Sequence, residues 1–403
     1  MRDVVVEYRQ PERLLFRLAA IYAGFLLTLR LSRFWGRTAL RRMIWSSLVI
    51  AGEPLEYHGR PHELLGGAAV GLAVIAPMVV AITALNMLLW PDPVLTAAAA
   101  DVYVLLLIFL FAWGDYMARR YQLSRTLWRG IRAGQDGSPL AYAGRYMLWT
   151  AAFFLTAGLS VPWAASDLAR YTLRHTLWGD YRGSFQGSAR QLLHAWLVTW
   201  VICIGPLLAV LLWMLSVSGW NANVILTQSG QILDLLITDD ENTFVVWVVA
   251  VVLCYAGIVW LGYRLRWMEW YVGNAAIGPL HAVCRLDRYD FIRHAAAGIL
   301  ACTGIVLGCV WLLQVLARNE VPVLADLDYE AFVWFAIAVV SVAWAMLGCA
   351  FHGLVYFPLL RSIAAGTAID NLAAADAVRQ RSEHAGGAGF GEILTDSAGL
   401  QVI

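Results

Sequence analysis

The side chains best suited to hold a metal lie in the segment His58-Gly-Arg-Pro-His62-Glu63. His62 and Glu63 form half of the helical His-Glu-x-x-His motif of zinc metalloproteases, which needs a second histidine at position 66. That position is Gly66, and Pro61 favours a turn that leads into an apolar run. We therefore predict a structural turn here and no metal site.

Other catalytic signatures are also missing from the sequence. It contains no phosphate-binding loop, nucleophile elbow, paired zinc ligands or Cys-x-x-Cys motif. Most of its cysteines lie inside apolar runs, so we predict free, packed thiols. We expect a protein without a cofactor that is not an enzyme. The cysteines are Cys203, Cys254, Cys284, Cys302, Cys309 and Cys349.

Polar residues inside apolar runs are the remaining candidates for chemistry, because charge is costly in a membrane. Asp101 lies about two turns inside its run, and Asn86 and Gln314 are the main neutral amides. These three residues would line a transport path if one exists. The alternative, which we favour, places Asp101 at the membrane interface.

The composition is that of an integral membrane protein. The chain has 403 residues, of which 60% are hydrophobic and 14% charged, and all 29 basic residues are Arg. A helix of about 20 apolar residues crosses a hydrocarbon core, and six runs are long enough. They are Leu64–Trp90, Leu95–Tyr116, Leu192–Leu215, Phe244–Leu261, Ala295–Ala317 and Ala331–Phe351.

The arginines are sorted between the connections of these runs. The connections at 91–93, 218–243 and after Ala317 carry acidic residues and only one arginine, Arg318. Arginine-rich flanks stay in the cytoplasm during insertion. The pattern predicts three helical hairpins that leave the cytoplasm and return, with both termini cytoplasmic.

Two shorter apolar runs, 14–31 and 146–166, would reverse this sorting if either crossed the membrane once. We predict that they are re-entrant or interfacial, with eight ordinary spans as the alternative. The predicted fold class is an all-α polytopic membrane protein with six spans in three hairpins and short cytoplasmic β-hairpins between them.

An Arg–Trp motif recurs where apolar runs meet polar segments, with a constant spacing of five from Leu to Trp. Helical spacing would bring Arg and Trp onto one face, where they suit the headgroup level of a membrane. We predict that these residues contact lipid, with an anionic ligand as the alternative. The residues are Arg41, Trp45, Arg120, Trp128, Arg170, Arg174, Trp178, Arg266 and Trp270.

Clusters of Gly, Asp and Pro follow the motif, and short runs around them are typical of β-hairpins. The layout predicts a first unit at 1–145, a second at 146–294, a helical hairpin at 295–360 and a cytoplasmic tail at 361–403 with a helix near 370–379. Gly67-x-x-x-Gly71 and Gly304-x-x-x-Gly308 favour close helix packing or a homo-oligomer.

The chain resembles the YjgN-type family of bacterial inner-membrane proteins, whose domain has no known function. The resemblance rests on Phe34-Trp35, on Arg41-Arg42-Met43-Ile44-Trp45 and on Gly52-Glu53-Pro54-Leu55-Glu56-Tyr57-His58. It continues in Pro162-Trp163, Leu168-Ala169-Arg170-Tyr171 and Gly391-Glu392-Ile393-Leu394. The resemblance implies an inner-membrane location and supplies no catalytic residues.

These observations favour a membrane scaffold or accessory subunit that serves the cell envelope, with membrane lipids and another envelope protein as partners. A transporter or channel for a small solute or lipid is the alternative. Nucleic-acid binding is not expected, because the basic stretches alternate with apolar runs.

Overall fold

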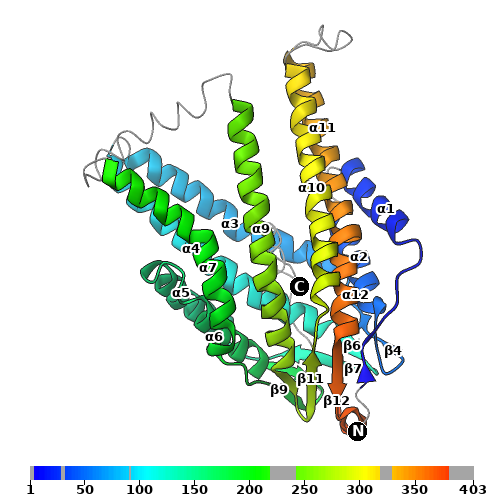
Figure 1. Cartoon of the computed structure of the whole chain (residues 1–403). Helices are drawn as coiled ribbons and strands as arrows, with labels where there is room; N and C mark the ends of the chain where they lie inside the picture. Colours follow the sequence, from blue (N-terminus) through cyan, green and yellow to red (C-terminus); the bar gives the residue numbers. More distant parts are fainter. Residues whose placement is uncertain (1–3, 29–31, 90–91, 218–241, 318–328, 381–403) are drawn as a thin grey trace.

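The computed structural model describes residues 4–28, 32–89, 92–217, 242–317 and 329–380 of the chain. Long helices leave a layer of short strands and diverge from it (Figure 1). The described helices are α1 (Leu14–Leu27), α2 (Arg33–Ser47), α3 (Pro61–Leu89), α4 (Pro93–Ser124), α5 (Pro139–Leu155), α6 (Val161–Arg174), α7 (Ala189–Val217), α9 (Asn242–Gly273), α10 (Arg288–Ala317), α11 (Tyr329–Ala350), the π-helix η2 (Phe351–Tyr356), α12 (Phe357–Gly366) and the 3-10 helix η3 (Leu372–Ala377).

All six predicted spans form helices. In the described part of the chain, four helical segments are long and apolar enough to cross a membrane: Pro61–Leu89, Val94–Ser124, Arg288–Leu312 and Ile337–Gly366. The other two predicted spans are the helices α7 and α9. The predicted acidic connections at 218–243 and 318–330 fall almost wholly outside the described residues.

The predicted re-entrant run 146–166 forms a helical hairpin, α5–α6, that reaches only part of the way along α7. Its tip is fixed there because the indole N–H groups of Trp196 and Trp200 donate to the carbonyls of Gly158 and Ala157, at 3.0 and 2.6 Å. Both tryptophans lie in the first half of α7. The hairpin therefore ends well before the helix beside it.

The predicted run 14–31 behaves similarly. Its helix α1 packs beside α11 and η2, where the Tyr22 hydroxyl lies 2.9 Å from His352 Nδ1 and the Tyr22 ring 6.0 Å from Trp344. Helix α2 then runs back toward the strands. Both short hairpins thus start and end at the strand layer, and their re-entry into a membrane stays a prediction.

The strands pair antiparallel throughout. One sheet has the order β1-β12-β11-β10-β9-β8-β7-β6-β5 and the other β2-β3-β4. The strands are β1 (Val4–Val5), β2 (Glu7–Tyr8), β3 (Leu48–Ile50), β4 (Glu53–Pro54), β5 (Glu56–Tyr57), β6 (Thr126–Trp128), β7 (Ile131–Gln135), β8 (Thr176–Trp178), β9 (Tyr181–Phe185), β10 (Ala275–Ile277), β11 (Leu280–Cys284) and β12 (Thr367–Asp370).

Two chain segments join these sheets into a closed ring. Strands β1 and β2 are consecutive halves of residues 4–8, and between them Val6 N donates to Thr367 O at 3.0 Å. Strands β4 and β5 are likewise halves of residues 53–57, where Leu55 N donates to Leu48 O at 3.0 Å. Each segment pairs with one neighbour on each side, so hydrogen bonds run around the whole ring. We call this structure the strand ring.

The strand ring corrects the predicted all-α class. The sequence pattern predicted short hairpins after the motif, and three form in these regions, β3–β4, β6–β7 and β8–β9. Two of them begin inside the motif, at Thr126 and Thr176, rather than after its Trp. The pattern did not predict that the hairpins join into one ring with a further hairpin, β10–β11, and with strands from both ends of the chain. The tail contributes β12 and a 3-10 helix where the sequence predicted one helix.

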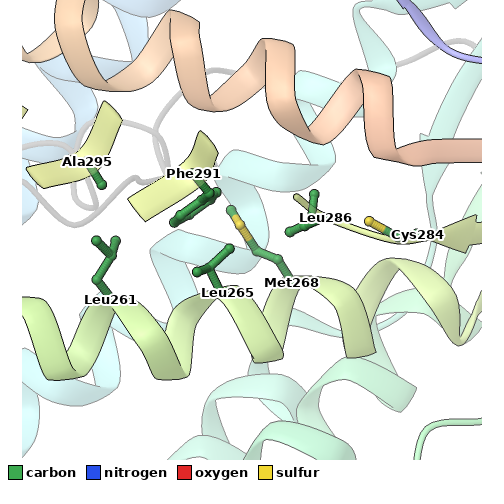
Figure 2. Packing of buried hydrophobic residues seen from close by; sticks show 7 residues of the cluster. All are labelled: Leu261, Leu265, Met268, Cys284, Leu286, Phe291 and Ala295. Atoms are coloured by element: carbon green, nitrogen blue, oxygen red, sulfur yellow. The ribbon is translucent and has the colours of Figure 1, made fainter. Parts of the chain in front are cut away.

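Most of the buried packing lies where the helices meet the strand ring. Figure 2 shows one such cluster, in which Leu265 and Met268 of α9 pack against Phe291 of α10 and Leu286. Similar clusters join α1, α2 and α12, and join α6, α7 and α9. By contrast, the four apolar segments are only 0 to 11% buried within the protein. The helices are therefore held at one end and present apolar surface along the rest.

Candidate functional site: the strand ring and its two mouths

The inside of the strand ring is filled by apolar side chains from strands around it. The indole rings of Trp128 on β6 and Trp178 on β8 pack against each other, with centroids 4.9 Å apart and planes tilted by 34°, and each is less than a tenth exposed. Ile50, Ile277 and Ile369 belong to the same cluster although they come from distant strands. A cluster shared by strands on opposite parts of a closed ring must lie inside it.

Tight turns set the position of these residues. In each hairpin the residue before the turn points into the cluster, and the next has a positive φ: Ala51, Arg129, Gly179 or Gly278. Trp128 and Trp178 occupy this place in two hairpins, whereas Ile50 and Ile277 occupy it in the others. The constant Leu-to-Trp spacing therefore grouped residues that are not structurally equivalent. Trp45 and Trp270 still lie inside α2 and α9, whereas Trp128 and Trp178 lie in strands.

The ring has two mouths, one at these turns and one facing the helices. We call the first the far mouth and the second the membrane mouth. Residues 371–380, after β12, cross the far mouth. There Ala375 and Val378 pack on the two tryptophans, and Asn371 Nδ2 donates to Pro279 O at 3.3 Å.

Charged groups hold the same segment to the hairpin turns. The Arg129 guanidinium lies 2.6 Å from Asp376 and 3.7 Å from Glu53. The Arg379 amide N–H donates to Asp180 Oδ1 at 3.0 Å. These contacts join the tail directly to the β6–β7 and β8–β9 turns, and Arg129 also links it to Glu53 of the β3–β4 hairpin. Sequence reasoning missed all of them because their partners are far apart in the chain.

A polar network lies at the membrane mouth. Asp136, directly after β7, bonds through one carboxylate oxygen to His175 Nδ1 at 2.8 Å and through the other to Arg182 at 2.7 Å. The Tyr116 hydroxyl of α4 donates to the Asp136 carbonyl. Both oxygens of the carboxylate are engaged, so this group joins two hairpins and a helix.

A second carboxylate has the same structural role. Glu63 accepts hydrogen bonds from the Tyr121 hydroxyl at 2.8 Å and from Arg125 at 3.0 Å, and thereby joins α3 to α4. The predicted turn at His58 and His62 therefore leads into a structural contact between helices. In the described residues no group of three or more metal-ligating side chains occurs.

Helices α4 and α5 meet through a third carboxylate. Asp115 lies 3.2 Å from Arg119 and accepts a hydrogen bond from the Tyr142 hydroxyl at 3.3 Å. Burial raises the pKa of Tyr142, so the phenol stays a neutral donor. All three carboxylates have cationic or hydroxyl partners, which makes interlocking between elements their evident role.

The structure places the aromatic members of the Arg–Trp motif against protein. Trp45 donates to Thr126 Oγ1 at 2.9 Å, and Trp270 donates to Ser188 O at 3.2 Å. Trp128, Trp178 and Trp270 are all buried. Lipid contact by these three rings was a wrong prediction, because the strand ring and neighbouring helices cover them.

The helical face predicted for Arg and Trp holds for only part of the motif. Arg41 and Trp45 lie on α2, and Arg266 and Trp270 on α9, but α6 ends at Arg174 and Trp178 is in a strand. Arg41 contacts Tyr57, at 3.3 Å from its hydroxyl, and Arg266 lies 3.7 Å from Glu269.

The exposed arginines of the motif remain predicted lipid or anion contacts. Arg120, Arg170 and Arg174 are exposed at the ends of α4 and α6, near the membrane mouth. Arg170 also lies 3.5 Å from the Gly187 carbonyl.

Among the described side chains, no hydrogen bond or ion pair joins the predicted transport residues Asn86 and Asp101. Asn86 donates to the Ile82 carbonyl of its own helix at 3.0 Å, and Asp101 is exposed on α4. The side chains of Gln314 and Cys254 lie outside the described part. The five described cysteines are free thiols, and burial raises the pKa of Cys284.

One comparison with known proteins gives a match. A model of a bacterial protein family of unknown function, DUF898, matches residues 25–321. It is the same family as the YjgN-type proteins and confirms that resemblance. No curated protein and no solved structure matches the chain.

Proposed function

Since the chain belongs to this bacterial family of unknown function, we propose that it is a multi-pass inner-membrane protein that acts as a scaffold or accessory subunit without catalysis. The observation that carries this proposal is a contrast in burial. The helices are well packed where they meet the strand ring, whereas the apolar segments are almost unburied within the chain. Such surface needs lipid or another protein to cover it.

The strand ring supports a simple membrane topology. Each pair of long helices begins and ends at the ring. The ring and its arginine-rich edges therefore lie on one side of the membrane. We take α3, α4, α7, α9, α10 and α11 as six spans, with the ring and both termini in the cytoplasm. The hairpins α1–α2 and α5–α6 then enter only the cytoplasmic leaflet.

Cysteine labelling tests this topology in a cysteine-free background. Asp92 and Asp180 are both exposed, one at the α3–α4 turn and the other at the far mouth. An impermeant maleimide added to intact cells with a permeable outer membrane should label Asp92→Cys and spare Asp180→Cys. Inverted vesicles should give the opposite result, and labelling of both residues from one side would exclude the topology.

Photocrosslinking tests the scaffold function. A benzophenone side chain at Leu88, which is 81% exposed near the end of α3, should give a discrete adduct with a protein. The control position is Leu265, which is 3% exposed at the base of α9. If Leu88 and the neighbouring Met87 capture only lipid in native membranes, the scaffold proposal fails.

A second candidate function is a transporter or channel. It is favoured by the arrangement of the helices. Consecutive helices are neighbours around the strand ring, and the first helix, α1, also packs against α11, which closes the circle. Asp101 is the main acidic candidate for such transport. Flux through reconstituted vesicles that Asp101→Asn abolishes would support transport, and unchanged flux would exclude a path that uses this carboxylate.

A further inference from the structure

The segment after β12 closes the far mouth of the strand ring with few apolar contacts. We call residues 371–380 the plug. Its buried side chains are Ala375 and Val378, which are 2 and 9% exposed and pack on Trp128 and Trp178. Leu372 and Ala374 of the plug also pack against this cluster but stay partly exposed. The plug therefore removes less apolar surface from water than the ring beneath it.

The polar contacts of the plug lie at its solvent-facing side. Asp376 contacts Arg129 at 2.6 Å, yet its side chain is 76% exposed. Gln380 Oε1 accepts from the Arg132 amide at 2.8 Å, and the Tyr181 hydroxyl donates to Ala374 O at 3.2 Å. Exposed ion pairs contribute little and are screened by salt.

Closure also leaves buried polar groups unsatisfied. The indole N–H groups of Trp128 and Trp178 are buried under the plug, and neither has a hydrogen-bond partner in the described structure. A buried donor without an acceptor is destabilising, and water at an open mouth would remove that penalty. The open state therefore gains hydration that offsets part of the lost packing.

Plug and ring approach each other closely at Gly179, in the β8–β9 turn. A Cβ atom there would lie 2.5 Å from the Arg379 carbonyl oxygen and 2.6 Å from Val378 Cγ1, both in the plug. It would also lie 3.1 Å from Ile131 Cγ2 of β7, a contact that a shift of a few tenths of an ångström relieves. Gly179 has a φ of +58°, which Asn also tolerates. A side chain at this position would thus push the plug outward while the turn keeps its conformation.

We propose that the plug is a detachable segment that leaves the far mouth while the strand ring stays folded. In the closed state it covers the tryptophan pair and acts as an autoinhibitory contact for that surface. In the open state Trp128 and Trp178 are accessible at the far mouth, and water reaches their two indole donors. This proposal does not depend on the proposed scaffold function.

Hydrogen exchange of the full-length protein in lipid nanodiscs tests the proposal. The reporters are the amides of Ala374 and Val378, which donate to Asn371 O and Ala375 O, and the comparison is strand β7. Gly179→Asn should speed exchange of the plug amides by roughly tenfold or more and leave β7 unchanged. Asp376→Asn should have a smaller effect in the same direction.

The matched control is Gly130→Asn, in the neighbouring β6–β7 turn. Gly130 has a φ of +72°, but no atom lies within 4 Å of its Cβ position, so this variant should exchange like the wild type. If Gly179→Asn speeds the plug and β7 together, the plug is part of the ring core and the proposal is overturned. Plug exchange as slow as in Gly130→Asn would overturn it equally.

Discussion

The indole rings of Trp128 and Trp178 lie in tilted contact inside the strand ring, with centroids 4.9 Å apart, although each belongs to a different hairpin. Antiparallel pairing of β7 with β8 brings the two hairpins together. These two tryptophans were expected to be membrane anchors next to apolar runs, and they instead form an aromatic contact inside the ring.

Removal of either ring from this contact should weaken the strand ring. We expect Trp178→Ala to destabilise the protein by about 3–5 kcal/mol, the usual cost of truncating a buried large aromatic residue. Thermal unfolding in detergent measures the effect. The control is Trp35→Ala, because Trp35 is 55% exposed on α2; equal losses in both variants would contradict a structural role for the contact.

Closure of the ring depends on the amide of Val6. Its N–H donates to Thr367 O at 3.0 Å and Val6 itself is buried. Val6→Pro removes the donor and leaves the carbonyl unpaired, so we expect a loss of about 1–3 kcal/mol. Val5→Thr is the control, since Val5 is half exposed and the change keeps a β-branched side chain. Similar melting temperatures for both variants would argue against a closed ring.

The tip of the α5–α6 hairpin should contact lipid. Leu155 is 87% exposed beside the first half of α7. A spin label at Leu155→Cys in a cysteine-free background should be relaxed by oxygen and protected from a water-soluble nickel complex. A label at Asp180→Cys should show the reverse. Strong relaxation of the Leu155 label by nickel would place the tip in water and refute re-entry.

The indole clamps should hold this tip in place. Trp196→Phe and Trp200→Phe each remove one hydrogen bond to the hairpin turn, worth about 0.5–1.5 kcal/mol. The spin label at position 155 should become more mobile in the double variant, because the carbonyls of Ala157 and Gly158 lose their donors. Unchanged spectra would show that packing alone fixes the hairpin.

Cys284 should react slowly with alkylating reagents. Burial raises the pKa of its thiol, while the Thr367 hydroxyl, 3.6 Å from the sulfur, lowers it. The thiolate is the reactive form, so the pH profile of alkylation shifts to higher pH than that of an ordinary cysteine. Thr367→Val should shift it further upward, as peptide mass spectrometry can measure. A profile at ordinary thiol pH would contradict this environment.

The sequence predicted elements whose signal is local. Apolar length predicted the long helices, and the Gly, Asp and Pro clusters predicted three hairpins. Closure of the ring was not predictable, because pairs such as Val4 with Ile369 join residues from the two ends of the chain. The Trp spacing misled us, although the turn glycines Gly179 and Gly278 marked the true alignment.

The candidate site was less predictable than the fold. Arg129, Asp136 and Asp376 belong to no sequence motif. Their contacts form only because the fold brings distant turns together, so the sequence alone did not indicate them. Conversely, Trp270 lies beside an apolar run in sequence but is covered by α6, α7 and β9 in space. Burial of this kind depends on tertiary contacts, which a hydropathy pattern does not contain.

The pairing of residues 4–6 with β12 has a consequence for biosynthesis. Strand β1 leaves the ribosome long before its partner, which emerges only when residues 367–370 have been made. Until then the edges of β1 and β11 are unpaired, which is a state prone to wrong association. The helical hairpins can enter the bilayer one after another during synthesis, but the ring is completed only after β12 has been made.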